Sequence, residues 1–209
     1  MPVLPTSSLA AMFSLALLGA SCSLTTDLSG LQKGAGGGSS SSAVCGDGII
    51  QAGEECDDGS SNPHSECVDC IVQCNRTADV KDPKTFHCYW YDGITVANFD
   101  NAIAHCAGLR TNGTLATITS EEEFTFVEKT IAVKSETWIG AIMTTTGKYR
   151  WVTGEPWDFS KWQQFYPDDS KEFAICIALG NEGLHWLNTP CATERRVLCE
   201  SSPLGKPAP

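Results

Sequence analysis

Short apolar runs with the character of β-strands recur through the C-terminal part of the chain. They are rich in β-branched and aromatic residues and lie at 86–91, 137–143, 149–152, 173–179 and 196–199. The first run is expected to be the first strand of a domain, and 137–143 its central strand. These runs predict a small sheet.

Two other stretches repeat their apolar residues at the spacing of a helix face. The first is 96–106, and three of its residues share one side: Phe99, Ile103 and Cys106. The second opens with the capping box Ser120-x-x-Glu123, and two apolar residues are directed inward: Phe124 and Val127. Because strands and helices form separate runs, the pattern predicts an α+β fold rather than βαβ units.

Between residues 154 and 173 the chain is polar and aromatic, with no period of two or of 3.6. We therefore expect a long irregular loop carried on the sheet. Five aromatic residues fall within it: Trp157, Phe159, Trp162, Phe165 and Tyr166. Some must belong to the core, and any that are exposed would form a platform for sugar rings or a hot spot for a protein.

The N-terminal segment, residues 1–22, has the pattern of an export signal. Its apolar stretch, 9–20, is too short to span a bilayer but suits a signal sequence, and small residues follow up to Cys22. This end is similar to a bacterial lipobox, in which Cys22 would be acylated and become the first residue of the mature protein. The alternative is ordinary cleavage after Ala20. Residues 23–44 are rich in Gly and Ser and are expected to form a flexible linker.

Eleven cysteines indicate an oxidising compartment outside the cytoplasm. Removing Cys22 leaves ten, an even number that suits disulfides. Zinc is the competing interpretation for Cys67-x-x-Cys70, but no second ligand pair follows at the spacing of a zinc finger.

Five of these cysteines lie between residues 45 and 74, among glycines at turn positions. Such a density predicts a unit, residues 45–80, that is held by bridges rather than by a core. Its CGDG, GE-x-CDDG and C-x-x-x-C elements resemble the Cys-rich disulfide repeat of extracellular myxobacterial proteins, with Cys67 as an addition. Asp47, Asp57 and Asp58 stand beside glycines, where they could hold calcium or simply form Asp-Gly turns; we expect the turns and a structural spacer.

The overall charge excludes one class of partner. The chain has 25 Asp and Glu against 14 Lys and Arg, a net charge of −11, so nucleic acid is not an expected partner. Four histidines, His64, His87, His105 and His185, stand outside any recognisable nucleophile or zinc motif. The carboxylates form no obvious acid–base pair, and we predict no enzymatic activity.

A sparse set of residues keeps a fixed order near the C-terminus. It reads Trp138-Ile139-Gly140, then Trp151-x-x-Gly154-x-Pro156, then Trp162, Cys176, Trp186, Cys191 and Cys199-Glu200. In this order the segment 81–202 resembles the C-type lectin-like domain. The resemblance implies two helices, small antiparallel sheets and a long loop, and it makes 203–209 a loose tail. It also implies three disulfides: Cys106–Cys199, Cys176–Cys191 and Cys74–Cys88.

The resemblance further implies binding of a glycan, alternatively of a protein, at the cell surface. In the sugar-binding relatives a calcium ion is held by a Glu-Pro-Asn or Gln-Pro-Asp motif, a Glu before the Cys, and Trp-Asn-Asp. The corresponding residues here are Tyr166-Pro167-Asp168, Ala174 and Trp186-Leu187-Asn188. Only Asp168 and Asn188 keep good ligand chemistry, so we expect no required cofactor and weak or absent calcium binding. The candidate ligand-binding residues are Tyr166, Asp168, Asp169, Glu172, Asn188 and Trp157.

Overall fold

The C-terminal domain is built on an eight-stranded sheet with one helix on each face. The computed structural model describes residues 43–60, 66–74, 78–168, 170, 175–181, 184–204 and 206–207, all within one compact unit. The signal segment with Cys22 and nearly all of the linker lie outside the described residues. The helices are α1 (Phe99–Leu109) and α2 (Glu121–Thr130). The strands are β1 (Ile49–Ile50), β2 (Cys67–Val68), β3 (Ile71–Val72), β4 (Val80–Lys81), β5 (Cys88–Ala97), β6 (Gly113–Leu115), β7 (Thr137–Met143), β8 (Tyr149–Trp151), β9 (Cys176–Leu179), β10 (Trp186–Thr189), β11 (Arg195–Ser201) and β12 (Lys206–Pro207).

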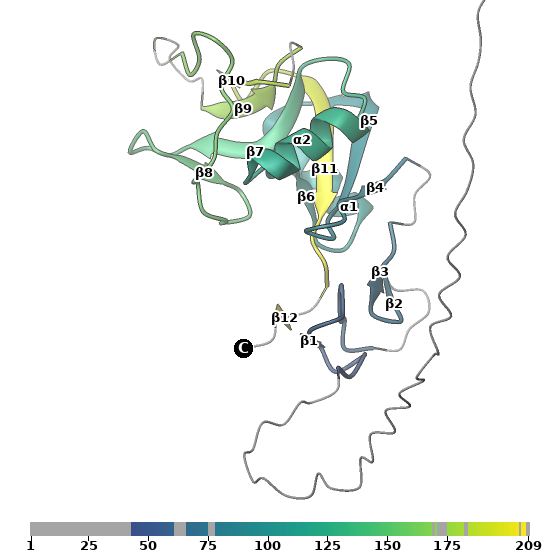
Figure 1. The fold of residues 1–209 in the computed structure, drawn as a ribbon. Coiled ribbons are helices and arrows are strands. Elements are labelled where there is room, and N and C mark those ends of the chain that lie inside the picture. The colour runs from purple at the N-terminus through teal and green to yellow at the C-terminus, as the bar shows by residue number, and fades with distance from the viewer. Residues whose placement is uncertain are drawn as a thin grey trace, which may run out of the picture. The chain divides into compact units, whose positions relative to one another are not determined.

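The strand order of the large sheet is β10-β9-β7-β11-β5-β4, with β6 paired to β11 and β8 paired to β7. Strand β11, the last strand of this sheet along the chain, runs antiparallel to β5 and parallel to β7, so it joins the two halves of the sheet. In Figure 1 the ribbon of α2 lies across this sheet, and β8, β9 and β10 are grouped on the side away from β4 and β5. This α+β architecture agrees with the sequence prediction.

Both faces of the sheet are buried, because successive strand residues point alternately to two separate cores. In β7, Ile139 packs with the α2 residues Phe124 and Val127. Its neighbour Trp138 packs on the other face with the α1 residues Phe99 and Cys106, as the helix patterns predict. The same alternation recurs along β5, β9 and β11, which explains why the apolar runs are short but nearly continuous.

Gly140 in β7 is required by a close approach of two backbones. A Cβ atom at this position would lie 2.7 Å from the carbonyl oxygen of Leu115 and 2.9 Å from Cγ2 of Val152. The amide of Gly140 donates to Ala116, and its carbonyl accepts from Val152. A side chain here would therefore separate β7 from the segments on both of its sides.

Several element boundaries differ from the sequence prediction, most clearly around β5 and α1. Strand β5 begins at Cys88 rather than at residue 86, because Phe86 closes a turn with a φ of 58°. The strand then runs on to Ala97, so α1 begins at Phe99 rather than at residue 96. The side chain of Asn98 caps α1 by accepting a hydrogen bond from the amide of Asn101, a signal that the apolar spacing alone does not contain.

The capping box of α2 is formed only in part. Ser120 accepts a hydrogen bond from the amide of Glu123 at 3.2 Å, as predicted. Glu123 does not bond the Ser120 amide in return; its Oε2 accepts from the amide of Thr119 at 2.6 Å, and its Oε1 accepts from the Tyr89 hydroxyl. The carboxylate is drawn inward because it is buried against β5, with only 3% of its surface exposed.

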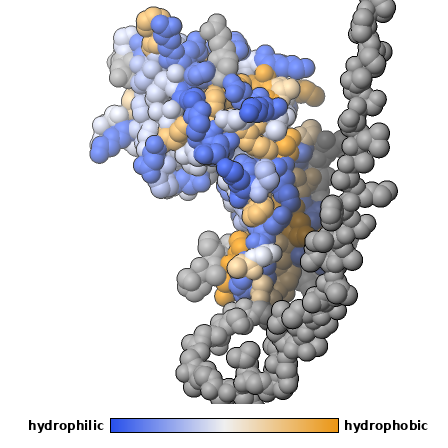
Figure 2. All heavy atoms as spheres, in the orientation of Figure 1, coloured by the Kyte–Doolittle hydropathy of each residue, from blue (hydrophilic) through white to orange (hydrophobic). Residues whose placement is uncertain are grey.

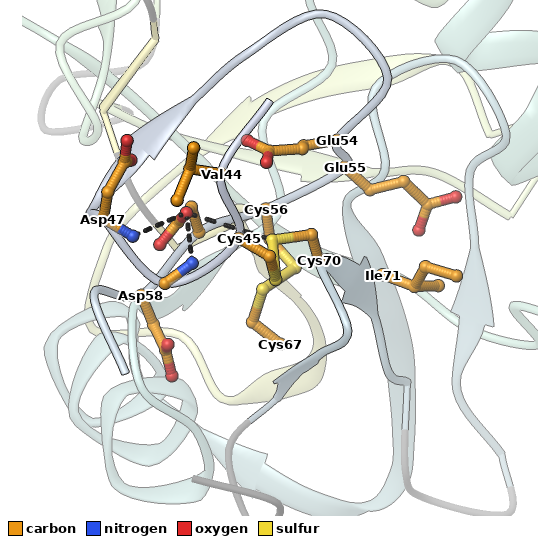
Figure 3. The surroundings of a disulfide bond; sticks show 12 residues. Val44, Cys45, Asp47, Glu54, Glu55, Cys56, Asp58, Cys67, Cys70 and Ile71 are labelled. Carbon is orange, nitrogen blue, oxygen red and sulfur yellow. Dashed lines mark hydrogen bonds between the residues drawn. A yellow bond between two sulfur atoms is a disulfide. The ribbon is translucent and has the colours of Figure 1, made fainter. Parts of the chain in front are cut away.

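The cysteine-rich segment, residues 45–80, is held by two internal bridges, Cys45–Cys70 and Cys56–Cys67. Figure 3 shows their sulfur atoms side by side at the centre of the segment. The Asp57 carboxylate accepts backbone hydrogen bonds from Gly46, Asp47, Gly48 and Gly59. Burial opposes ionisation of this carboxyl, but these four bonds prevail and lower its pKa.

Asp57 therefore organises turns within the segment, as the Asp-Gly interpretation predicts. Asp47 and Asp58 make similar local bonds, to the amides of Ile49 and Ser60. Cys70, which lies close to Asp57, is closed in a disulfide and has no thiolate to offer a metal.

The cysteine-rich segment is joined to the C-terminal domain by a bridge and by polar contacts. Cys74 is bonded to Cys88 in β5, and Lys81 forms an ion pair with Glu55 at 2.8 Å. The buried Arg110 at the end of α1 forms an ion pair with Glu66 at 3.0 Å. The tail is also tied to this segment, because the carbonyl of Leu204 accepts from the amide of Asp57 and β12 pairs with β1. The expectation of a loose tail is thus wrong for the described residues 203–204 and 206–207.

Candidate functional site in the long loop

The loop that follows β8 is anchored by its aromatic residues. Trp186 of β10 is fully buried, and its ring lies 5.5 to 6.0 Å from four others, those of Trp151, Trp157, Phe159 and Trp162. Tyr149 stacks on Trp157 with the ring centroids 5.5 Å apart. Trp157, proposed from sequence as a ligand contact, is thus half-buried within this aromatic cluster.

Backbone bonds fix the middle of the loop to β10. The amide of Trp186 donates to the carbonyl of Lys161 at 2.7 Å, and the amide of Gln163 donates to the carbonyl of Trp186 at 2.9 Å. Lys161 also forms an ion pair with Glu121 of α2 at 2.6 Å. Long as it is, the loop is held at defined points and can present side chains in fixed positions.

Phe165 is the exception among the loop aromatics. Its side chain is 86% exposed, whereas the other four aromatics of the loop are half-buried against the two cores. It precedes Tyr166 and Pro167, which are joined by a cis peptide bond, and Asp168. The sequence indicated that some loop aromatics would belong to the core, and the structure decides that Phe165 is the one left exposed.

Asp168 and Asn188, the two residues that keep calcium-ligand chemistry, lie together. Asn188 is 2% exposed, its Oδ1 accepts from the amide of Asp168 at 2.8 Å, and its Nδ2 donates to the carbonyl of Asp168 at 3.1 Å. One carboxylate oxygen of Asp168 accepts from the hydroxyl of Ser170 at 2.5 Å. The side-chain amide of Asn188 thus binds the loop backbone through both its oxygen and its nitrogen.

These residues do not fit the family's calcium ion. Ala174 and Leu187 have no ligand atom in their side chains. Asn188 is engaged with the backbone of Asp168, and Tyr166 offers only a neutral phenol. Among the described residues of this loop, no three acidic, His or Cys side chains bring ligand atoms within 4.8 Å of one another. Asp169 and Glu172, the other candidates from sequence, lie outside the described residues.

A second polar cluster, missed by the sequence analysis, lies at the junction of β5, α2 and β11. Single atoms of His87, Glu123 and Glu200 all lie within 4.8 Å of one another. Glu200 is 2% exposed, and its Oε2 is 3.5 Å from Nδ1 of His87. The sequence had pointed to Glu123 as a helix cap and to Glu200 as the end of the Cys-Glu motif. Their proximity depends on the pairing of β5 with β11 and could not be seen from either motif.

Thr117 connects this cluster to the base of the long loop. Its hydroxyl lies 2.5 Å from Glu200 Oε1 and 2.7 Å from Glu155 Oε2. One hydroxyl has one hydrogen, so it can donate to only one of the two carboxyls at a time. Burial raises the pKa of Glu200, and the contacts with His87 and Thr117 offset this effect only in part.

The same cluster raises the pKa of His87. Burial alone would lower it, but the Glu200 carboxyl, and after it Glu123 and Glu155, prevail and raise it above 6.5. The folded protein therefore binds the imidazole proton of His87 more tightly than the unfolded chain does. The stability it contributes is fully present below pH 6.5 and is lost as the pH rises through the folded-state pKa.

We therefore predict that the free energy of unfolding falls between about pH 6 and about pH 8. Urea unfolding at both pH values measures this fall, which should be smaller in His87→Gln because the titrating group is gone. Glu200→Gln, which removes the main partner, should reduce it as well. An equal fall in wild type and both variants would contradict the prediction.

The other histidines of the described chain have structural surroundings. His105 lies in α1 with its Nε2 2.9 Å from Asp92, and the ring of His185 lies 5.9 Å from that of Phe124. Burial opposes ionisation of Asp92, but bonds from Thr95, Ile94 and His105 lower its pKa to about 2. Asp92 is thus a structural anion, not a general base for neutral pH.

Comparison with known proteins identifies the fold family. The family model of the lectin C-type domain matches residues 95–201, just over half of the chain. The chain belongs to the C-type lectin domain family. It is 32% identical over 121 residues to C-type lectin 16 of Aedes aegypti, covering 51% of this chain and 77% of the relative.

Solved structures agree with this assignment. The carbohydrate-recognition domain of cow CD23, determined in the presence of a GlcNAc2Man3 oligosaccharide, is 27% identical with a TM-score of 0.53. The match covers 61% of this chain and 95% of that one. A calcium-independent type II antifreeze protein has the same fold at 23% identity, with a TM-score of 0.53 and coverage of 61% and 93%. C-type lectin domains are non-catalytic binding domains, in agreement with the sequence prediction.

Three of the five disulfides join the same cysteines as the family resemblance implies: Cys106–Cys199, Cys176–Cys191 and Cys74–Cys88. With the two bridges of the cysteine-rich segment, they pair all ten cysteines from residue 45 onward. This is the state of a protein that folds in an oxidising compartment. Within the described part of the chain, the helices are too short or too polar to cross a bilayer.

Proposed function

We propose that this C-type lectin domain binds carbohydrate through its long loop without a standard calcium site. The observation that carries the proposal is the loop surface, where an exposed aromatic side chain lies beside polar groups on a backbone tied to β10. Sugar sites combine these two chemistries, because pyranose rings have an apolar C–H face and a rim of hydroxyls. The CD23 domain, solved in the presence of an oligosaccharide, supports the assignment by similarity.

Within this proposal Tyr166 and Asp168 form the polar part of the site, with Asp169 and Glu172 as further candidates. Asn188, named as a candidate from sequence, has the supporting role of holding the backbone of Asp168. Trp157 stabilises the loop through the contacts of its ring with those of Trp151 and Trp186. The alternative is a protein-binding domain, since an exposed aromatic residue on a fixed loop is also the usual form of a protein hot spot.

A glycan array separates the two, run once with calcium and once with chelator. Carbohydrate binding predicts a restricted set of glycan signals that persist in chelator. Signals that disappear in chelator would restore a calcium-dependent mechanism, and the absence of any glycan signal would favour the protein-binding alternative.

We predict that excess calcium leaves the thermal midpoint nearly unchanged. A ligand of the native state raises the midpoint by mass action, and the described residues of the loop do not bring together the charged oxygen ligands that would give useful affinity. Thermal melts with calcium and with chelator measure this, with Asp168→Ala as the control variant. A rise of many degrees that Asp168→Ala abolishes would show a functional calcium site.

We also propose that the protein is an exported bacterial lipoprotein, displayed from the outer membrane or at the cell surface. Residues 1–22 would be the signal with its lipobox, 23–44 the linker, 45–80 a disulfide repeat of the myxobacterial type and 81–202 the lectin domain. The Gly- and Ser-rich linker suits a module held at a distance from an anchor. The alternative is secretion after cleavage behind Ala20.

We predict that Cys22→Ser moves the protein from the membrane fraction to the soluble fraction. The reason is that the acyl chains on Cys22 would supply a strong membrane attachment, whereas the helices of the described residues cannot cross a bilayer. Fractionation followed by intact-mass analysis of the N-terminus tests this. A mature N-terminus at Ser21, or a variant that stays with the membrane, would contradict lipidation.

A further inference from the structure

Phe165 combines two unfavourable features at one position. Its side chain is 86% exposed, and its φ is 69°, in the left-handed region that bulky residues avoid. Phe86 and Leu184 also have positive φ, but both pack against apolar cores of the protein. Among the described residues, Phe165 is the only large apolar residue with positive φ that gains no burial in return.

The local geometry explains why the backbone has this conformation. The amide of Tyr166 donates to the carbonyl of Gln163 at 2.9 Å, which closes a four-residue turn with Phe165 at its third position. A positive φ at that position is typical of a type II turn, where glycine is the preferred residue. A glycine here would relieve the backbone and remove an exposed ring, so the phenylalanine does not serve the folded state alone.

The turn is also held rigidly from both sides. Before it, the amide of Gln163 donates to the carbonyl of Trp186 in β10. After it, the amide of Asp168 donates to the side chain of Asn188, also in β10. The ring is thus carried on a backbone fixed to the buried sheet, which lowers the entropy lost when a ligand stacks on it. Residues strained in this way are concentrated at ligand sites.

The surroundings indicate the chemistry of the ligand. The exposed Gln164, the half-buried Tyr166 and the Asp168 carboxylate lie next to the ring along the chain and offer hydrogen bonds to hydroxyl groups. The nearest lysine in the sequence, Lys161, is paired with Glu121. The chain as a whole has a net charge of −11. This environment suits a neutral ligand and repels an anionic one. Figure 2 shows hydrophilic residues over most of the drawn face of the domain, with hydrophobic ones interspersed.

We infer that Phe165 is the stacking platform of the binding site and that its ligand is a neutral pyranose ring, with one apolar face on the aromatic ring. This inference rests on the proposed carbohydrate-binding function and adds the contact residue and the ligand class. An uncharged sugar provides the apolar face for Phe165 and hydroxyl groups for the neighbouring polar residues. Sulfated or sialylated glycans, which are anionic, would be repelled by the net negative charge of the chain.

The test uses the opposite effects that Phe165→Gly should have on stability and on binding. Because glycine accepts positive φ, the thermal midpoint should rise by about 2–4 °C. Binding to immobilised mannan, galactan or chitin, measured in chelator, should weaken by about tenfold or more. Phe165→Trp should keep the affinity. Ile94→Ala, which removes another side chain that is 88% exposed, should change neither the affinity for these polysaccharides nor the thermal midpoint by a comparable amount.

The outcomes are distinguishable. If wild type binds one of these polysaccharides and Phe165→Gly binds it equally, the platform is wrong while carbohydrate binding stands. If Phe165→Gly lowers both the midpoint and the binding, the residue is structural and the inference is also wrong. Tighter binding of wild type to heparin than to the neutral polysaccharides would overturn the ligand class. If wild type binds none of them, the proposed function fails and the inference fails with it.

Discussion

Replacing both Cys106 and Cys199 by alanine should lower the free energy of unfolding by about 4–5 kcal/mol. The bridge joins α1 to β11 across 93 residues, and both half-cystines are fully buried. In the chain-entropy model, the stabilisation grows with the length of the loop that the bridge closes, because a longer loop loses more freedom in the unfolded chain. Urea unfolding of the double variant measures the loss.

The short bridge of the same domain provides a matched comparison. Cys176–Cys191 closes only 15 residues, and its removal should destabilise by about 3 kcal/mol. Equal losses for the two double variants would show that packing around the sulfurs, rather than loop length, governs the effect. A non-reducing peptide map of the wild type should contain both bridges. Cys176 joined to any cysteine before residue 100 would contradict the structure.

Trp186→Ala should destabilise the domain by about 3–5 kcal/mol, the range for truncation of a large buried aromatic residue. The side chain is fully buried and lies between the core and the loop, with four aromatic rings around it. Its removal leaves a cavity at the base of the loop. We therefore also expect faster proteolysis of the loop, because the aromatic residues that anchor it lose their common contact.

Trp157→Ala is the matched control for this prediction. Trp157 belongs to the same cluster but is half-buried, so its loss should cost clearly less stability than that of Trp186. Thermal or urea unfolding of both variants tests the order. A larger effect at Trp157 would mean that the loop aromatics, and not the β10 tryptophan, form the centre of the cluster.

The sequence was most informative where a residue has one compatible environment. Gly140 is glycine because a Cβ atom would collide with the backbone of Leu115, and a motif can record such a requirement without any knowledge of the fold. Strand β7 was predicted with its exact bounds because both of its faces are buried and its apolar run is unbroken. The bridge pairs of the lectin domain were those that the family resemblance implies.

Sequence was less informative where two elements compete for the same residues. Val96 fits the apolar face of a helix with Phe99 and Ile103, but the pairing of Ala97 with Arg195 keeps residues 96 and 97 in β5. Glu123 has the position of a capping residue, yet the Tyr89 hydroxyl and the Thr119 amide hold its carboxylate instead. In both cases a partner distant along the chain decides the outcome, and local propensity contains no information about it.

The sequence alone determined the family, the α+β class, the position of the long loop and the loss of calcium-ligand chemistry at Ala174 and Leu187. Those properties depend on which side chains are present and in what order. The tertiary structure alone decided that Asn188 binds the backbone of Asp168, that His87 meets Glu200, and that Phe165 is exposed while its aromatic neighbours are packed. These properties depend on how β10, β5 and the loop turn around one another, because burial and contact distances arise only when segments far apart in the chain are brought together.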